Sequence, residues 1–188
     1  MTLRLSSALA AGRIAANATR HLHLGGGTVL PGHVAGWLDP SALGTLAGRL
    51  PQGIVLVTGT NGKTTTARMV ASIATAAGLA PVHNRSGANL PAGVLAALVS
   101  QATLGGELRG DLGVFEVDEA HLPAIALQAR PHVLVLTNLF RDQLDRYGEI
   151  DSIAAAWERT IARLPASASL VVNIDDPRLA HLDRKSVV

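Results

Sequence analysis

The chain alternates short continuous apolar runs with longer segments in which apolar residues recur every three or four positions. Continuous runs of this length are typical of buried parallel strands, and they lie at 54–57, 81–83, 112–117, 132–137 and 169–174. The three- or four-residue spacing predicts helices from residue 63 onward, at 90–101 and at 150–164. Because strands and helices alternate, we expect a three-layer α/β fold with a parallel sheet and right-handed crossovers.

The same spacing gives two of these helices an apolar face. On the helix from residue 63, this face carries Met69, Val70, Ile73 and Ala77. On the helix at 150–164, it carries Ile150, Ile153, Trp157, Ile161 and Leu164. Asp118 and Glu119 follow the strand at 112–117, and we expect them to begin a further helix.

The N-terminal segment could be mistaken for a signal peptide, but its charges argue against one. Arg13 interrupts the apolar stretch, and Arg20 and His21 occupy the place of a cleavage site. We therefore expect residues 3–20 to form a short, basic, amphipathic helix that packs on the domain. Its apolar positions include Leu5, Leu9 and Ile14. A basic face beside leucines, here with Arg4, leaves open a peripheral contact with anionic lipid.

Composition indicates one domain with an N-terminal appendage. At 188 residues and 48% hydrophobic, the chain can bury one good core. Glycines at 25–27 and prolines at 31 and 40 predict a loop-rich connector, so residues 1–50 form the helix and connector and 51–188 the domain. The absence of cysteine excludes disulfides and thiolate metal sites. Aromatic residues make up 3% and the net charge is +2, which disfavours nucleic-acid binding.

The strand at 54–57 leads into T-G-T-N-G-K-T (58–64), a glycine-rich turn at the start of a helix. Unpaired N–H groups and the helix dipole favour a polyanion there, such as the triphosphate of ATP. Gly59 and Gly62 let the backbone approach the phosphates, and Lys63 can reach the β and γ oxygens. The hydroxyl of Thr64 can ligate Mg²⁺.

Polar residues stand where other strands end, at the edge where open parallel sheets bind ligands. Glu116 ends an apolar strand, where a carboxylate is costly unless it is paired or metal-bound. With Thr64 it is expected to complete a magnesium site, and the alternative is a capping or solvent-exposed acid. Asn138 follows the next strand and can hydrogen-bond phosphate or a metal-bound water.

Two further polar clusters leave alternatives open. Arg141, Asp142 and Asp145 brace their loop by ion pairs or contact substrate. In Asn173-Ile-Asp-Asp-Pro177, the acids face the nucleotide or form an Asx turn before the proline.

The glycine-rich turn is tighter than the common phosphate loop, which requires a glycine where this chain has Val57. This form resembles the Mur ligase and folylpolyglutamate synthetase superfamily. With S-G-A-N (86–89), F-E-V-D-E (115–119) and N-L-F-R-D-Q-L-D-R-Y-G-E-I-D (138–151), the chain resembles the MurT family, the ligase subunits of lipid II isoglutaminyl synthases. The resemblance covers nearly the whole chain and implies a Mur ligase type ATP-binding domain.

The turn and the resemblance together assign the candidate site. Lys63 and Glu116 would act in catalysis, and Thr64 and Glu116 would hold the metal. The residues expected to bind the nucleotide are Gly59, Thr60, Asn61, Gly62, Lys63, Thr64, Thr65, Asn138 and Asn173.

The resemblance also implies an activity. ATP would phosphorylate the D-glutamate α-carboxylate of lipid II, and ammonia from a GatD-type glutaminase partner would attack the acyl phosphate to give D-isoglutamine. Lys63 and the magnesium ion would screen the like charges of carboxylate and triphosphate. The implied location is cytoplasmic, at the inner face of the cell membrane if the basic helix contacts lipid.

Two departures from ordinary Mur ligases agree with this family. Gln143 stands where those ligases carry a histidine that helps hold a second magnesium, and the helix at 150–164 has no lysine to be carbamylated. How a second metal would be held stays open. The segment before Ile54 is too short for a domain that binds a UDP-sugar peptide, which favours a lipid-linked acceptor.

MurT-like proteins continue into a cysteine-built zinc ribbon and a C-terminal domain, so we expect this chain to be truncated and inactive alone. One alternative is a folylpolyglutamate or muramyl ligase, which joins an amino acid instead of ammonia. Gln143 and the missing lysine argue against it. The other is a fragment that binds nucleotide without catalysis, which truncation favours.

Overall fold

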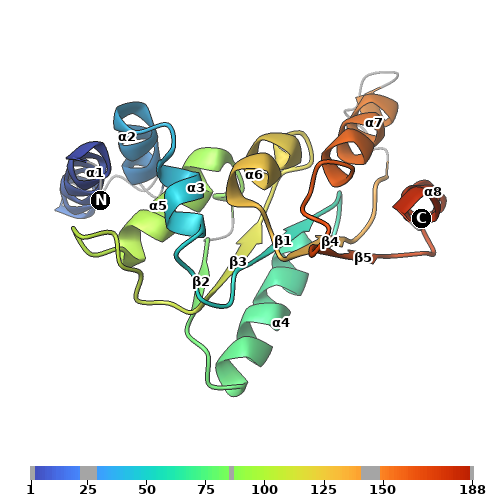
Figure 1. Ribbon diagram of the computed structural model, residues 1–188, viewed down its shortest axis with the longest axis horizontal. Helices are drawn as coiled ribbons and strands as arrows, with labels where there is room; N and C mark the ends of the chain where they lie inside the picture. Colours follow the sequence, from blue (N-terminus) through green and yellow to red (C-terminus); the bar gives the residue numbers. More distant parts are fainter. Residues whose placement is uncertain (1–2, 22–28, 85–86, 141–148, 187–188) are drawn as a thin grey trace.

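The computed structural model describes residues 3–21, 29–84, 87–140 and 149–186, without the side chains of residues 20, 149 and 183–186 (Figure 1). Five parallel strands form one sheet in the order β2-β3-β1-β4-β5. The strands are β1 (Ile54–Thr58), β2 (Pro81–His83), β3 (Leu112–Glu116), β4 (Val133–Leu136) and β5 (Ser169–Val172). The expected parallel sheet is confirmed, and the strand before the glycine-rich turn lies at its centre.

The register brings the carboxyl ends of the three central strands to one edge of the sheet. Val57 of β1 lies opposite Glu116 of β3, and Thr58 lies opposite Leu136 of β4. The segments that follow these strands therefore meet at this edge, where an open α/β sheet binds its ligands.

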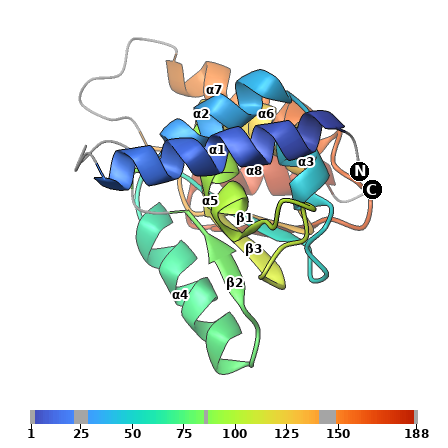
Figure 2. The same ribbon diagram turned by 90° about the vertical axis from the view of Figure 1, so that its left-hand side faces the viewer.

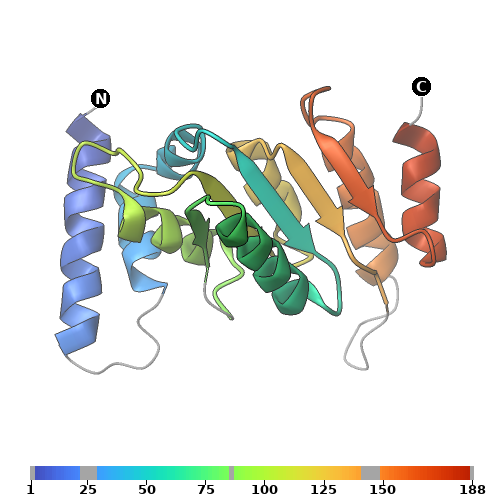
Figure 3. The ribbon, with the colours of Figure 1, turned by 90° about the horizontal axis from the view of Figure 1, so that it is seen from below.

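Helices lie on both faces of the sheet, which confirms the three layers. Helices α3, α6 and α7 lie above the sheet in Figure 1, and α4 lies below it, as the view from below in Figure 3 also shows. The helices are α1 (Leu3–His21), α2 (Leu30–Leu38), α3 (Ala42–Ala47), α4 (Lys63–Ala76), α5 (Pro91–Gln101), α6 (Leu122–Ala129), α7 (Glu149–Ile161) and α8 (Pro177–Ser186). The larger core lies between the sheet and the helices other than α4, and Trp157 and Phe115 are among its fully buried side chains.

The N-terminal helix is confirmed, but the expected loop-rich connector contains two helices. Pro31 lies in the first turn of α2, where the missing N–H costs nothing, so a proline there starts a helix and does not break one. Helix α1 packs against α2, and α2 packs against α5. Leu5 and Leu9 are buried as expected, whereas Ile14 is 69% exposed.

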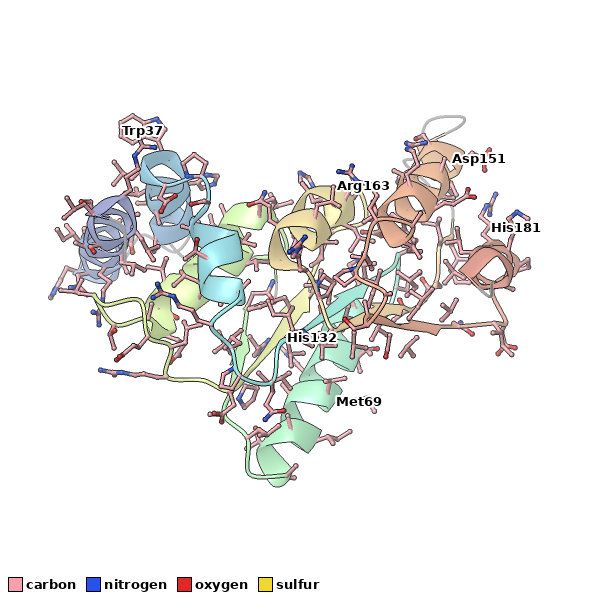
Figure 4. The ribbon with its side chains drawn as sticks, viewed as in Figure 1. Trp37, Met69, His132, Asp151, Arg163 and His181 are labelled. Carbon is pink, nitrogen blue, oxygen red and sulfur yellow. The ribbon has the colours of Figure 1, made fainter. Side chains whose placement is uncertain are left out.

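Helix α4 buries a different face from the one predicted. Its buried residues are Ala67, Ala71 and Ala74, whose small side chains let the helix lie close to β1 and β3. Met69 and Ile73 are 59% and 67% exposed, and Figure 4 shows Met69 pointing away from the sheet. The prediction weighted the larger apolar residues, and the packing uses the smaller ones.

Helix α6 begins at Leu122, so Asp118 and Glu119 do not begin it. Asp118 Oδ1 instead accepts the N–H of Ala120 at 3.1 Å and lies 2.9 Å from Nδ1 of His121. These contacts form a turn, because an aspartate side chain offers the backbone an alternative to helical hydrogen bonds. The turn leaves Glu119 beside the carboxyl edge of the sheet.

Candidate functional site

The turn between β1 and α4 has the backbone shape of a phosphate-binding loop. Gly59 and Gly62 have φ angles of 137° and 83°, which glycine adopts without strain. Gly62 is the N-cap residue of α4 and has no side chain to cover the first turn. Helix α4 is 14 residues long, so its first N–H groups and its dipole favour an anion at this place.

The segment after β4 holds this loop. A Cβ on Gly59 would lie 2.2 Å from Oγ1 of Thr137, so the close approach requires glycine. Asn138 bonds both backbone groups of Asn61: its Oδ1 accepts the N–H at 2.8 Å, and its Nδ2 donates to the carbonyl at 3.0 Å. Asn138, which we expected to contact phosphate or a metal-bound water, is thus engaged in shaping the phosphate loop.

Thr60 anchors the same loop through its side chain. Its hydroxyl accepts the N–H of Phe140 at 3.0 Å and lies 3.2 Å from the carbonyl oxygen of Phe140. Thr65 lies in the first turn of α4 and is exposed. The predicted loop residues 59–65 therefore come together, with Asn138 beside them.

Lys63 points back across the phosphate loop. Its Nζ donates to the carbonyl oxygens of Gly59 and Thr60, at 2.5 and 3.1 Å, and lies 3.1 Å from Oε2 of Glu119. The two side chains are only 14% and 18% exposed, so water screens this ion pair weakly. The ammonium group therefore lies beside the place where the loop would bind an anion.

Glu119 is a site residue that our sequence analysis missed. Its carboxylate pairs with Lys63, and its backbone carbonyl accepts Nε1–H of the buried Trp157 at 2.9 Å. Trp157 thereby ties α7 to the loop after β3. The position of Glu119, three residues after Glu116 at a strand end, was a signal for this role that the expected helix start obscured.

Thr64 and Glu116 meet as predicted. The hydroxyl of Thr64 donates to Oε2 of Glu116 at 2.7 Å, and Glu116 is only 6% exposed. The contact brings a hydroxyl and a carboxylate oxygen together beside the phosphate loop. The reading of Glu116 as a solvent-exposed acid is therefore wrong.

Asn84, at the end of β2, fixes the backbone of Glu116. Its Oδ1 accepts the N–H of Glu116 at 2.9 Å, and its Nδ2 donates to the carbonyl oxygens of Glu116 and Ala88, at 2.8 and 2.7 Å. Asn84 is 1% exposed, so these bonds are shielded from water. A polar residue directly after a strand was the available signal for this role.

The donor set fits a magnesium ion that shares its coordination with a nucleotide. Mg²⁺ prefers oxygen ligands and is usually held by one or two carboxylates together with substrate phosphates. Thr64 supplies a hydroxyl and Glu116 a carboxylate, which are the ligands that the protein would contribute. Within the ranges that the structure describes, no three His, Asp or Glu side chains gather into a metal site of their own.

Asn173 and the acids after it form a turn, away from the phosphate loop in the strand order. Asn173 Oδ1 accepts the N–H of Asp175 at 3.1 Å, which closes an Asx turn. Buried Asp176 accepts the N–H groups of Leu139 and Arg178, at 2.6 and 2.9 Å. Of our two alternatives for these acids, the structure supports the turn, and Asp176 joins the start of α8 to the segment after β4.

Several residues named in the sequence analysis lie outside the described residues. They are Arg141, Asp142, Gln143 and Asp145, the glycines at 25–27 and residue 86. In the described part of the chain, no helix combines the length and the apolar character that crossing a membrane requires.

Comparison with known proteins agrees with this geometry. The chain is 37% identical over 156 residues to the MurT subunit of lipid II isoglutaminyl synthase from Staphylococcus aureus (strain N315), covering 83% of this chain and 34% of that protein. It is 39% identical over 138 residues to the UDP-N-acetylmuramate–L-alanine ligase of Aquifex aeolicus (strain VF5), covering 73% of this chain and 28% of that protein. The chain thus spans about a third of the length of these relatives.

A solved structure with the same fold is MurF ligase from Thermotoga maritima in complex with ADP. It has a TM-score of 0.63 and 21% identity, and the match covers 76% of this chain and 33% of that one. The family model of the Mur ligase middle domain matches residues 57–187, which include the phosphate loop, Glu116 and every strand after β1. This chain belongs to the Mur ligase middle domain family.

Proposed function

We propose that this chain is the ATP-binding part of a ligase subunit that amidates lipid II in peptidoglycan biosynthesis. The observation that supports this most strongly is that Lys63, Thr64 and Glu116 lie together at one phosphate loop. The MurT relative from S. aureus, a subunit of a lipid II isoglutaminyl synthase, supports this acceptor. The ADP complex of T. maritima MurF supports a nucleotide on this fold.

The proposed reaction has two steps. An oxygen of the D-glutamate α-carboxylate attacks the γ-phosphorus of ATP, and the bond from that phosphorus to the β–γ bridging oxygen breaks, releasing ADP. Ammonia then attacks the acyl carbon, the bond to the phosphate oxygen breaks, and inorganic phosphate and a proton leave. The products are D-isoglutamine, ADP and phosphate.

The residues of this chain would bind and orient the triphosphate. The N–H groups at the start of α4 would bind its oxygens, and Lys63 would move from Glu119 to the β and γ oxygens. Thr64 and Glu116 would hold Mg²⁺, which supplies charge that stabilises the transferring phosphoryl group. None of these groups acts as a general base, so positioning is their remaining contribution.

The ammonia is proposed to come from a GatD-type glutaminase subunit, since the S. aureus relative is described as a glutamine-hydrolysing synthase subunit. With lipid II as the proposed acceptor, the reaction is proposed to take place at the cytoplasmic face of the membrane. The domain division is proposed to follow residue 50, with the helices before it as an appendage to the ATP-binding domain.

A second candidate is ligation of an amino acid. The 39% identity to the muramate–alanine ligase of A. aeolicus favours it, because that enzyme is named for joining L-alanine. Gln143 in place of a histidine and the absence of lysine from 150–164 favour the amidation. A third outcome is nucleotide binding without ligation.

The first experiment tests the phosphate loop. A nonhydrolysable ATP analogue with Mg²⁺ at a hundredfold excess over its Kd should stabilise the chain by about 2.7 kcal/mol, a shift of several degrees in Tm. Lys63→Ala should remove most of that shift, whereas Arg68→Ala, on the exposed side of α4, should leave it unchanged. An equal shift in Lys63→Ala would refute the assignment.

The second experiment identifies the product. The chain, joined to the part of the S. aureus MurT subunit that it does not cover, is incubated with ATP, Mg²⁺, lipid II and either ¹⁵N-ammonium or L-alanine. Label in the D-glutamate carboxamide, read by mass spectrometry, is the expected result. L-alanine-dependent ATP turnover without label would favour the second candidate, and no turnover would favour the third.

A further inference from the structure

Helix α1 is apolar on two opposite sides. Leu5 and Leu9 are buried on its inner side. On its outer side, Leu3 and Ile14 are 89% and 69% exposed, and they stand eleven residues apart, which is three helical turns. A helix at the surface of a globular protein normally turns a polar face outward. Figure 2 shows α1 at the front of the view, with the rest of the molecule behind it.

Helix α2, packed against α1, exposes a second apolar group. Leu30, His33 and Trp37 occupy one side of it, at positions i, i+3 and i+7, and all three are exposed. Trp37 is 83% exposed, and in Figure 4 it projects from the end of α2 away from the sheet. A tryptophan so placed has an apolar ring and a polar N–H, which suits a boundary between water and lipid.

The N-terminal segment that contains these residues carries charges of one sign. Residues 1–38 contain no Asp or Glu, although the chain has 14 of them. Arg4 follows Leu3, and Arg13 precedes Ile14, so the two arginines lie about 100° around the helix on opposite sides of the apolar stripe. Basic residues that flank an exposed apolar stripe on both sides are typical of helices lying in a membrane interface.

We propose that the outer surface of α1 and α2, formed by Leu3, Arg4, Arg13, Ile14, Leu30 and Trp37, docks on an anionic phospholipid bilayer. Leu3, Ile14 and Trp37 enter the boundary between headgroups and acyl chains, and the arginines bind lipid phosphates. The acid-free, basic character of this surface favours an anionic bilayer over a protein partner. The proposal extends the proposed function, because a lipid-linked acceptor lies in such a bilayer.

The two tryptophans of the chain provide the measurement. Trp157 is fully buried and bonded to Glu119, whereas Trp37 is exposed. On addition of phosphatidylglycerol vesicles, Trp37 emission should shift to the blue, and the chain should sediment with the vesicles. Phosphatidylcholine vesicles and high salt should reduce both effects.

Variants test the surface itself. Arg4→Glu with Arg13→Glu, and separately Ile14→Asp, should each weaken vesicle binding about tenfold. Met69→Ser, which alters an exposed apolar residue on α4, is the control and should bind normally. Absence of binding to anionic vesicles, or equal binding by the charge-reversed variant, would overturn the proposal.

Two further readouts distinguish lipid docking from self-association and from nucleotide binding. If the parent chain is a dimer, Ile14→Asp dissociates it, and neither the parent nor the variant binds vesicles, then a second copy covers this face. That result would overturn the proposal. The nucleotide-dependent Tm shift should persist in every surface variant. If Lys63→Ala still binds vesicles but loses the nucleotide-dependent Tm shift, the result supports lipid docking and the phosphate loop separately. If the parent chain shows the Tm shift but does not bind vesicles, only the lipid docking is overturned.

Discussion

Two carboxylates three residues apart, Glu116 and Glu119, engage neighbouring residues of the phosphate loop in opposite ways. Glu116 accepts a hydrogen bond from Thr64, so it adds negative charge where a cation would sit. Glu119 pairs with Lys63, so it takes up positive charge that a triphosphate would use. The two acids should therefore have opposite effects on nucleotide binding.

Glu116→Gln should lower the part of the nucleotide affinity that depends on Mg²⁺ by about tenfold, or roughly 1.4 kcal/mol. The amide keeps the size of the side chain and still accepts the Thr64 hydroxyl, so Tm without ligand should change little. Titration of the ATP analogue with Mg²⁺ and with EDTA measures the difference. A variant that unfolds readily yet binds Mg-ATP normally in the cold would show Glu116 to be structural.

Glu119→Gln should raise the affinity for metal-free ATP severalfold, because it removes a like charge and frees Lys63 for the phosphates. Asp118→Asn is the matched control, since Asp118 carries the same charge one residue away but bonds Ala120 and His121. Calorimetric titration in EDTA compares the two variants. Equal affinities for Glu119→Gln and the parent chain would contradict this role.

Sequence could predict the site residues whose role follows from the loop itself. Lys63 and Thr64 are fixed by their place after Gly62, and Glu116 by its strand end. Roles that depend on tertiary contacts could not be predicted: Asn138 bonds the backbone of Asn61, a partner 77 residues away. Such a pairing is created by the register of β1 and β4, which no local pattern encodes.

At the scale of elements, the contact between α2 and α5 depends on one glycine. A Cβ on Gly32 would lie 1.7 Å from the backbone oxygen of Ala92. Backbone atoms cannot yield as a flexible side chain can, so any larger residue must push the helices apart. Gly36, one turn later, faces only the side chain of Leu95 at 3.3 Å.

Gly32→Ala should destabilise the chain by about 1–3 kcal/mol through overpacking. Gly36→Ala is the control: it gains up to about 1 kcal/mol of helix propensity and should leave Tm equal or slightly higher. Thermal unfolding of the two variants provides the comparison. If Gly32→Ala is as stable as Gly36→Ala, the close packing of α2 on α5 is wrong.

The elements themselves were predictable to different degrees. All five strands were, because parallel strands read as continuous apolar runs, although β5 at the sheet edge is not buried as such a run suggests. Helices α2 and α3 were not, since Pro31, Gly32 and Pro40 are typical of loops unless a neighbouring helix packs on them. The buried face of α4 was also unpredictable, because alanines such as Ala67 and Ala71 contribute little to an apolar pattern yet permit the closest approach.

At the scale of the molecule, we expect the 188 residues alone to bind nucleotide but not to amidate lipid II. The chain spans about a third of its relatives, and the described site gathers groups for the triphosphate. Orientation of an acceptor is worth roughly 7–11 kcal/mol of a barrier, which the phosphate loop cannot replace. Amidated lipid II from the purified chain with ammonium would contradict this expectation.

The central place of β1 in the sheet also sets the order in which the protein can take shape during synthesis. Both neighbours of β1, β3 and β4, are translated after it, and the clamp at Asn138 comes later still. A nascent chain must therefore carry this strongly apolar strand unpaired until β3 has emerged, about 60 residues later, and paired on one side only until β4 has emerged, about 80 residues later. Such long-range pairings form slowly and expose the chain to aggregation. Nucleotide binding becomes feasible only once β4 and Asn138 have joined β1, so it marks the pairing of β1 on both sides.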